Sequence, residues 1–152
     1  MKYLISQQFA VQTAMCKFLF IGLFIPGLIF ANSAYATFGD IALTPPKIVN
    51  LSGKEMNVIK VDSSVGLSSI LTNHAPSERK FTYIVQILSK EGGTEYLEGL
   101  SASIHPNQSF TASQYWIPKE AGQYTVQIFV WDSLASAMPL TKVIQTQITV
   151  SN

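Results

Sequence analysis

Short runs in which apolar and polar residues alternate recur along the chain from about residue 58 onward. The clearest of these runs is Gly122–Trp131. Because side chains on a β-strand point alternately to opposite faces, a period of two divides this run into a core face and an outward face. The core set is Tyr124, Val126, Ile128 and Val130, and the outward set is Thr125, Gln127, Phe129 and Trp131.

Two further runs alternate in the same way. In Lys80–Leu88 the apolar set is Phe81, Tyr83, Val85 and Ile87, and near the C-terminus Ile144, Ile148 and Val150 alternate with Gln145, Gln147 and Thr149. Turn-forming residues separate the runs, and no segment has a convincing amphipathic helical pattern. This spacing predicts an all-β, antiparallel sandwich of about seven strands. The expected strands are Val58–Val61, Val65–Thr72, Lys80–Leu88, Thr94–Ser101, Ser109–Tyr115, Gly122–Trp131 and Lys142–Val150.

Residues 37–53, which precede these runs, differ in character from them. The pair Pro45-Pro46 favours extended backbone, and Lys47–Leu51 can pair as a first, edge strand. We therefore divide the chain into an N-terminal segment (1–36), a linker with an edge strand (37–53) and a β-sandwich domain (54–152).

The N-terminal segment has the order of a secretory signal peptide. Lys2 and Lys17 are its only charges, and Phe18–Ala31 is a run of fourteen uncharged residues. Small residues then occupy the −3 and −1 positions relative to a cleavage site between residues 36 and 37. The predicted cleavage residues are Ala34, Ala36 and Thr37.

The alternative is an N-terminal segment that stays in place as a membrane anchor. Fourteen apolar residues fall short of the ~20 that span a bilayer as a helix, although the stretch from Phe18 to Ala36 nearly suffices. The sixteen residues between Met1 and Phe18 are many for a simple signal. Export is therefore expected in both cases, and release from the membrane depends on cleavage.

Cleavage would change the chemistry of the chain. The whole chain has a formal net charge of +1. Residues 37–152 keep eight basic residues and all nine acidic ones, which gives a net charge of −1. Nucleic-acid binding is disfavoured because it calls for a basic patch or stripe. The only cysteine, Cys16, lies in the removed segment, so a mature domain would have no thiol.

The residues around the clearest strand resemble a known family. Trp116-Ile117-Pro118 is followed by Ala121-Gly122-Gln123-Tyr124-Thr125-Val126 and then Phe129-Val130-Trp131, with Phe81–Gln86 upstream. This pattern is similar to the immunoglobulin-like, adhesion-type (CARDB-like) domains of exported archaeal and bacterial surface proteins. The Gly-x-Tyr step suits a tyrosine that hydrogen-bonds back across a corner. The resemblance implies an immunoglobulin-like fold and says little about function.

We find no constellation of residues that suits catalysis or metal binding. His74 and His105 fall in expected turns, with no cysteine and no His-x-His spacing, whereas zinc and copper sites need several converging ligands. The chain also lacks a Gly-x-Ser-x-Gly elbow and a phosphate-binding glycine loop. We therefore expect no enzyme activity, no metal and no cofactor.

Two kinds of residue remain as candidates for contact with other molecules. Asn50 and Asn107 begin Asn-x-Ser sequons and are candidate glycosylation acceptors in an exported chain. Phe129 and Trp131 lie on the outward face of their strand, where they could anchor a partner. If Ser133–Pro139 folds over these two rings, they are satellite core instead. Trp116 is expected to close one end of the sandwich.

These observations predict a secreted or cell-surface, non-enzymatic binding or structural module. Its partner would be an unidentified protein or surface glycan, and it would contact a membrane only through an uncleaved N-terminal segment. One alternative is an accessory subunit of a membrane complex, anchored by that segment. Another is a small secreted protease inhibitor that presents a loop such as Asp132–Thr141.

Overall fold

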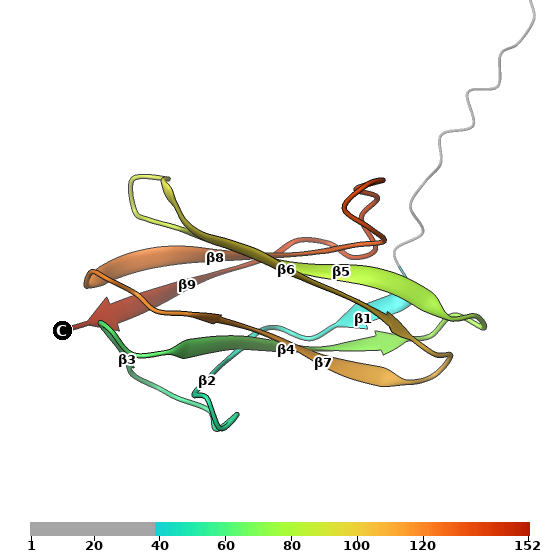
Figure 1. Ribbon diagram of the computed structural model, residues 1–152, viewed down its shortest axis with the longest axis horizontal. Coiled ribbons are helices and arrows are strands. Elements are labelled where there is room, and N and C mark those ends of the chain that lie inside the picture. Colours follow the sequence, from blue (N-terminus) through green and yellow to red (C-terminus); the bar gives the residue numbers. More distant parts are fainter. Residues whose placement is uncertain (1–38) are drawn as a thin grey trace, which may run out of the picture. The chain divides into compact units, whose positions relative to one another are not determined.

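The computed structural model describes residues 39–152, which form two β-sheets packed face to face (Figure 1). The expected all-β, immunoglobulin-like sandwich is confirmed, and the signal or anchor helix lies outside the described residues. Among those residues, no helix is long and apolar enough to cross a membrane. The nine strands in this part of the chain are β1 (Ile41–Leu43), β2 (Lys47–Val49), β3 (Ile59–Lys60), β4 (Val65–Asn73), β5 (Arg79–Leu88), β6 (Thr94–Ile104), β7 (Ser109–Trp116), β8 (Gly122–Trp131) and β9 (Ile144–Ser151).

The first sheet is built around β4. Both β1 and β2 pair antiparallel with the same edge of β4, β1 opposite residues 71–73 and β2 opposite residues 66–68. Pro45 and Pro46 lie between them, and proline has no N–H with which to continue a ladder. The single edge strand expected at Lys47–Leu51 is therefore one half of a divided strand, and it ends at Val49. β7 pairs with the other edge of β4.

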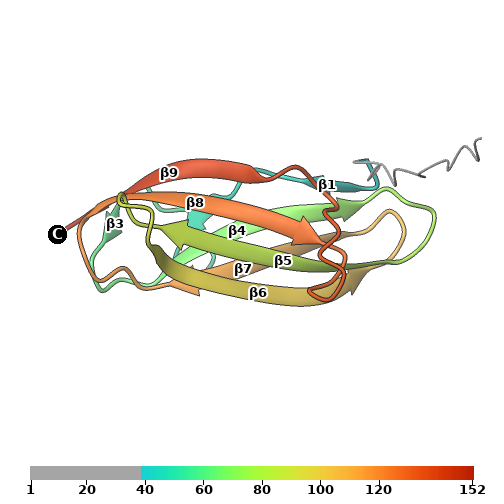
Figure 2. The same cartoon turned by 90° about the horizontal axis from the view of Figure 1, so that it is seen from above.

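The second sheet has five strands in the order β3-β9-β8-β5-β6, and Figure 2 shows β9, β8, β5 and β6 side by side. Its β5, β6, β8 and β9 pair antiparallel, as predicted. β3 is the exception, because Ile59 and Lys60 pair parallel with Val150 and Ser151 of β9. β9 itself begins at Ile144 rather than at the expected Lys142.

The core lies between the two sheets, and the core faces predicted for β5 and β8 are confirmed. The eight residues concerned are all buried. They are Phe81, Tyr83, Val85 and Ile87 in β5, and Tyr124, Val126, Ile128 and Val130 in β8. In β9, Ile148 and Val150 are buried and Ile144 is half-buried. Strict alternation therefore identified the inward side of these strands.

A tyrosine corner closes one end of the sandwich. The Tyr124 hydroxyl donates a hydrogen bond to the carbonyl oxygen of Glu120 at 2.9 Å, across the turn that precedes β8. The Tyr124 ring meets Trp116 edge to face, with ring centroids 5.0 Å apart. Trp116 is buried, as expected of a residue that closes an end of the core. The Gly122-x-Tyr124 step thus has the role that the resemblance to immunoglobulin-like domains implied, a tyrosine that hydrogen-bonds back across a corner.

At one side of the sandwich, the edges of the two sheets lie next to each other. β6 ends the five-stranded sheet and β7 ends the other, and the Tyr96 hydroxyl donates to the side-chain oxygen of Gln114 between them at 3.3 Å. Glu98 of β6 lies opposite the buried Val85, so its side chain leaves the strand on the inner side of the sheet, at the open edge where it is still exposed. A charge at such a position opposes the pairing of an edge strand with a second chain.

Candidate binding surface

The outer face of the five-stranded sheet carries apolar side chains. Ile84 of β5 has Phe129 of β8 on one side and Gly99 of β6 on the other. Although no third layer covers this face within residues 39–152, Ile84 is only 6% exposed. A Cβ atom on Gly99 would stand 3.6 Å from the Cγ1 atom of Ile84. Neighbouring side chains on the same face therefore shield Ile84 from water.

The two aromatic residues singled out from the sequence lie together on this face. The ring centroids of Phe129 and Trp131 are 6.0 Å apart, and the rings are tilted by 58°. Trp131 lies opposite Thr82, whose hydroxyl is hydrogen-bonded to that of Ser101 at 2.8 Å. Phe129 and Trp131 are both half-buried, so each keeps part of its ring open to solvent.

The connection from β8 to β9 extends this face. The Asp132 N–H donates to the Met138 carbonyl oxygen at 2.9 Å, and the Leu140 N–H donates to the Val130 carbonyl oxygen at 2.8 Å. Residues 138–140 therefore continue the β8 pairing before the regular ladder of β9 begins at Ile144. In Figure 1 the loop stands above the five-stranded sheet, and in Figure 2 it crosses over β5 toward β6.

The Asp132 carboxylate closes this loop at its base. It accepts hydrogen bonds from the Ser136 hydroxyl, from the Ser133 N–H at 2.6 Å and from the Met138 N–H at 3.2 Å. The Ser136 hydrogen bond holds the pKa of Asp132 below its usual value; burial opposes this, and the two backbone hydrogen bonds add to it. Leu134 is 65% exposed at the tip, so the loop presents an apolar side chain on an internally bonded frame.

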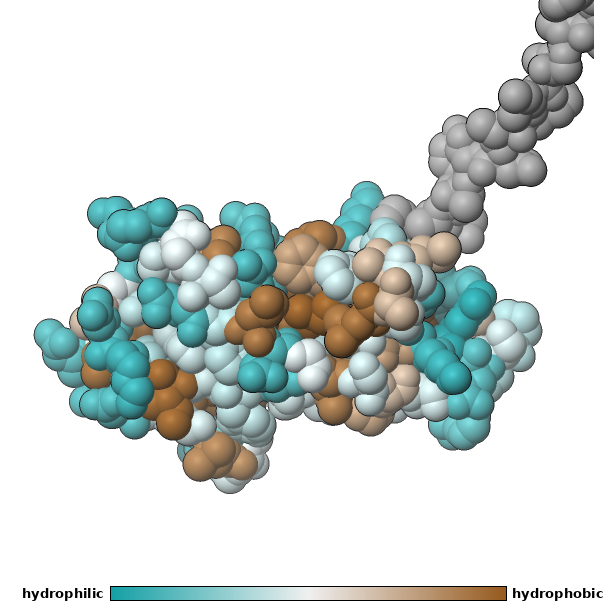
Figure 3. Space-filling view, turned by 45° about the horizontal axis from the view of Figure 1, so that its top comes forward, coloured by the Kyte–Doolittle hydropathy of each residue, from teal (hydrophilic) through white to brown (hydrophobic). Residues whose placement is uncertain are grey.

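Exposed aliphatic side chains also lie on β6 and in the loop that follows β8. Leu97 on the outward side of β6 is 58% exposed, and Met138 in the loop is also exposed. Figure 3 shows hydrophobic side chains gathered over the middle of this side of the domain. We call the set Ile84, Leu97, Phe129, Trp131, Leu134 and Met138 the outer apolar patch.

The rest of the outer face is polar and nearly free of charge. Neither β8 nor β9 contains a charged residue. Gln86, Gln127 and Gln145 stand in one row across β5, β8 and β9. The Gln127 amide donates to the Gln145 side-chain oxygen at 3.3 Å. The face therefore joins an apolar patch to a row of amides.

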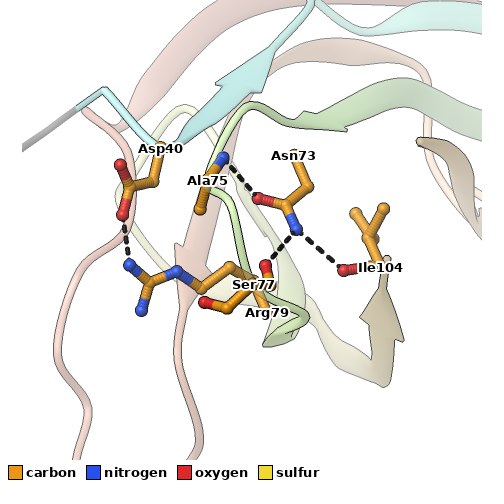
Figure 4. A network of polar contacts seen from close by, with 6 residues as sticks. All are labelled: Asp40, Asn73, Ala75, Ser77, Arg79 and Ile104. Carbon is orange, nitrogen blue, oxygen red and sulfur yellow. Dashed lines mark hydrogen bonds and ion pairs between the residues drawn. The ribbon is translucent and has the colours of Figure 1, made fainter. Parts of the chain in front are cut away.

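A second polar cluster lies at the turn between β4 and β5, and its role is structural (Figure 4). The Asn73 side chain is fully buried. Its amide nitrogen donates to the carbonyl oxygens of Ser77 and Ile104, each at 2.9 Å, and its oxygen accepts from the Ala75 N–H at 2.9 Å. Beside this amide, Arg79 forms an ion pair with Asp40, and both side chains are partly exposed. The buried amide uses its hydrogen-bonding capacity within the fold.

The two sequon asparagines lie in turns. The Asn50 side-chain oxygen accepts hydrogen bonds from the Ser52 hydroxyl at 2.7 Å and from the Ser52 and Lys54 N–H groups at 3.0 and 2.9 Å. Asn107 has a φ angle of 58°, a left-handed conformation that asparagine tolerates better than most residues. Its side chain is exposed, whereas Asn50 is half-buried.

The remaining candidates lie elsewhere. His74 and His105 are both exposed, and the His105 Nδ1 atom is 3.7 Å from a Glu78 carboxylate oxygen. Within the described part of the chain, no three histidine, cysteine or acidic residues converge as a metal site would require. The predicted cleavage residues Ala34, Ala36 and Thr37 lie outside the described residues.

Sequence reasoning overlooked the amide row and the exposed Leu97. The signal for the row was present, since Gln127, Gln145 and Gln147 occupy alternate positions opposite the core residues of their strands. A polar residue at such a position is normally interpreted as a solvated one. Only the strand register brings Gln86, 41 residues earlier in the chain than Gln127, into the same row.

Comparison with known proteins finds similar structures but no similar sequences. No protein-family model matches the chain, and no curated protein matches it in sequence. A β-glucuronidase from glycoside hydrolase family 2 matches in structure with a TM-score of 0.55 at 10% identity, over 71% of this chain and 11% of its own. The chain thus spans about a tenth of that enzyme.

Two smaller domains match over most of their length. The C-terminal domain of Wzt has a TM-score of 0.56 at 8% identity, with 75% of each chain covered. The CARDB domain of a Pyrococcus furiosus protein, in complex with di-metal ions, has a TM-score of 0.54 at 18% identity, over 76% of this chain and 90% of its own. The described residues therefore form an immunoglobulin-like β-sandwich with the fold of a CARDB domain.

Proposed function

We propose that this protein is an exported, non-enzymatic binding module that engages its partner through the outer face of the five-stranded sheet. The observation that carries the proposal is the outer apolar patch. It combines a half-buried aromatic pair with exposed Leu97 and Leu134, and no other layer of residues 39–152 covers it. Aromatic anchors among exposed apolar side chains are typical of interaction sites.

The N-terminal segment supports export, because its charged start, apolar run and small residues before Thr37 have the order of a signal peptide. The intact mass of the protein purified from cells that express the full chain tests this point. We expect a chain that begins at Thr37. A mass that includes Met1 would favour instead the accessory subunit anchored by an uncleaved segment.

A matched pair of substitutions tests the binding face. Leu97→Arg places a charge within the outer apolar patch, and Leu51→Arg makes the same change at a leucine that is 72% exposed between β2 and β3. Both side chains are largely in water, so neither variant should lose much stability. Binding to isolated cell envelopes of the source organism should fall at least tenfold for Leu97→Arg and stay unchanged for Leu51→Arg.

Two outcomes would contradict the proposal. One is the absence of any envelope binding by the unaltered protein. The other is equal binding by the unaltered protein and Leu97→Arg, which would move the binding site to another face. Circular dichroism and thermal melting of both variants would establish that the comparison is between folded proteins.

A further inference from the structure

We infer that the outer face binds an uncharged polysaccharide, with the amide row as the hydrogen-bonding part of the site and the aromatic pair as its stacking part. This inference rests on the proposed function and names the class of its ligand. It starts from the distribution of glutamine. Of the seven glutamines in residues 39–152, five lie on the outward side of the five-stranded sheet: Gln86, Gln123, Gln127, Gln145 and Gln147.

The strand register arranges these amides in order. Gln86 lies directly opposite Gln127, which in turn lies opposite Gln145. Neighbouring strands in a sheet are about 4.8 Å apart, so the three side chains form a line perpendicular to the strands. Gln147 follows Gln145 on the same side of β9 and lies opposite Thr125. An extended ligand lying across the sheet would therefore meet one amide on each of β5, β8 and β9.

The amides keep capacity for a ligand. Gln127 donates one hydrogen bond to Gln145, and Gln86 donates one to the Thr94 hydroxyl at 3.1 Å. Each side-chain amide has two N–H donors and an oxygen with two acceptor positions. These internal bonds use a part of that capacity and restrict the orientation of the side chains. A sugar hydroxyl also donates and accepts, so it can pair with both ends of an amide.

The electrostatics of the face favour an uncharged ligand. β8 and β9 have no charged side chain, and on the outward side of β5 the one charge is Lys80, at the far end from Gln86. On β6, Glu95 lies near the start of the strand, and Glu98 lies opposite the inward Val85. Exposed protein surfaces are commonly rich in lysine and glutamate. A ligand with charges of its own would lose hydration here without gaining an ion pair. A neutral, hydroxyl-rich polymer avoids that cost.

The aromatic pair completes the site. Phe129 is two residues along β8 from Gln127, on the same face, and Trp131 follows it. The negative face of an aromatic ring attracts the weakly positive C–H groups on the apolar side of a sugar ring. Both rings are half-buried, which fixes their orientation while leaving surface free. Leu97, opposite Gln86 on β6, adds an apolar edge to the same row.

The test uses protein purified from cells that express the full chain and isolated envelopes of the source organism. One envelope sample is treated with periodate, which cleaves sugar diols, and another with protease. We expect periodate to abolish binding and protease to leave it intact. We also expect binding to change little between 0.05 and 0.5 M NaCl, because no ion pair contributes.

A matched set of variants locates the site. The double variant Gln127→Ala/Gln145→Ala should bind untreated envelopes about tenfold more weakly than the unaltered protein does, because several hydrogen bonds to the ligand are lost. Gln108→Ala, in the exposed turn before β7, is the control and should bind normally. These side chains lie at the surface, so all three proteins should melt at similar temperatures. Purified cellulose, mannan and starch, with polygalacturonate as the acidic comparison, then identify the sugar.

The outcomes separate this inference from the proposed function. Binding that is destroyed by protease, resists periodate and is lost in Leu97→Arg would overturn the polysaccharide and leave a protein-binding module. Binding that is periodate-sensitive yet unaffected by Gln127→Ala/Gln145→Ala would overturn the amide row as the site. A preference for polygalacturonate that disappears in 0.5 M NaCl would overturn the uncharged ligand. No binding to any envelope would overturn both proposals.

Discussion

Replacement of Tyr83 by phenylalanine tests how the core is held together. Tyr83 is fully buried in β5, and its hydroxyl lies 3.2 Å from the Ser69 hydroxyl oxygen and 3.4 Å from the Leu67 carbonyl oxygen. Burial raises the pKa of Tyr83 to about 12, although the hydrogen bond with Ser69 opposes the rise. Tyr83→Phe keeps the ring and removes the hydroxyl. At pH 8 the lost hydrogen bond should cost about 1 kcal/mol of unfolding free energy.

The same substitution should have a different effect at high pH. Because the pKa of Tyr83 is higher in the folded protein than in the unfolded chain, the unfolded chain loses its proton first. The stability that neutral Tyr83 contributes is therefore complete below pH ~10 and is lost as the pH rises toward ~12. For a rise of about two units, linkage removes about 1.4 kcal/mol by pH 11. The phenylalanine variant has no such proton, so its deficit should vanish at that pH.

Urea unfolding followed by circular dichroism at pH 8 and pH 11 measures both effects. The pKa values of Tyr96 and Tyr124 are also raised by burial, but these residues titrate in both proteins and cancel in the comparison. Tyr115→Phe, at an exposed tyrosine of β7, is the matched control and should differ little from the unaltered protein. If Tyr83→Phe costs the same at both pH values, the reasoning from burial to proton linkage is wrong.

Three further substitutions probe packing, the buried amide and the loop. Gly66→Ala should lower stability by about 1–3 kcal/mol, because the new Cβ atom would stand 2.7 Å from two neighbouring side chains. Gly99→Ala should cost little, because the nearest atom to its Cβ would be 3.5 Å away. Thermal melting of the two variants makes the comparison. Asn73→Ala removes three hydrogen bonds and should lower the free energy of unfolding, measured with urea, by about 3 kcal/mol. A loss no larger than that of His74→Ala, at an exposed residue, would contradict this. The lowered pKa of Asp132 means that the stability it gives the loop is present above its unfolded-state pKa and is lost as the pH falls through the folded-state value. Asp132→Asn should speed amide hydrogen exchange in the loop near pH 7, and unchanged exchange would show that the carboxylate does not hold it.

Local pattern was enough to predict the parts of this fold that depend on alternation. The inward faces of β5 and β8 followed from a strict period of two, and the Tyr124 corner followed from Gly122 two residues before it. The burial of Ile84 on the outer face could not be predicted in this way. The burial of Ile84 depends on Phe129, which lies beside it on the next strand. The register between β5 and β8 brings these two residues together, although they are 45 residues apart in the chain.

Two other features have no local signal. The parallel pairing of Ile59 with Val150 joins segments at opposite ends of the domain, and no residue type within β3 indicates it. The division of the edge strand into β1 and β2 was marked by Pro45-Pro46, but the pairing of Ile41–Leu43 on the near side of the prolines was not anticipated. The amide row likewise emerges only when β5, β8 and β9 are brought into register.

The inward position of Glu98 has a consequence for the order of events during folding. The β5–β6 hairpin closes a short loop and can form early, whereas β3 must find β9 across about ninety residues and is expected to join late. The eleven-residue edge of β6 is open to other unfinished chains during this interval, and it remains an edge of the sheet in the folded protein. A carboxylate halfway along that edge would have to be buried in any intermolecular sheet. We therefore expect Glu98 to contribute little to the final free energy and much to the yield of monomer at high concentration.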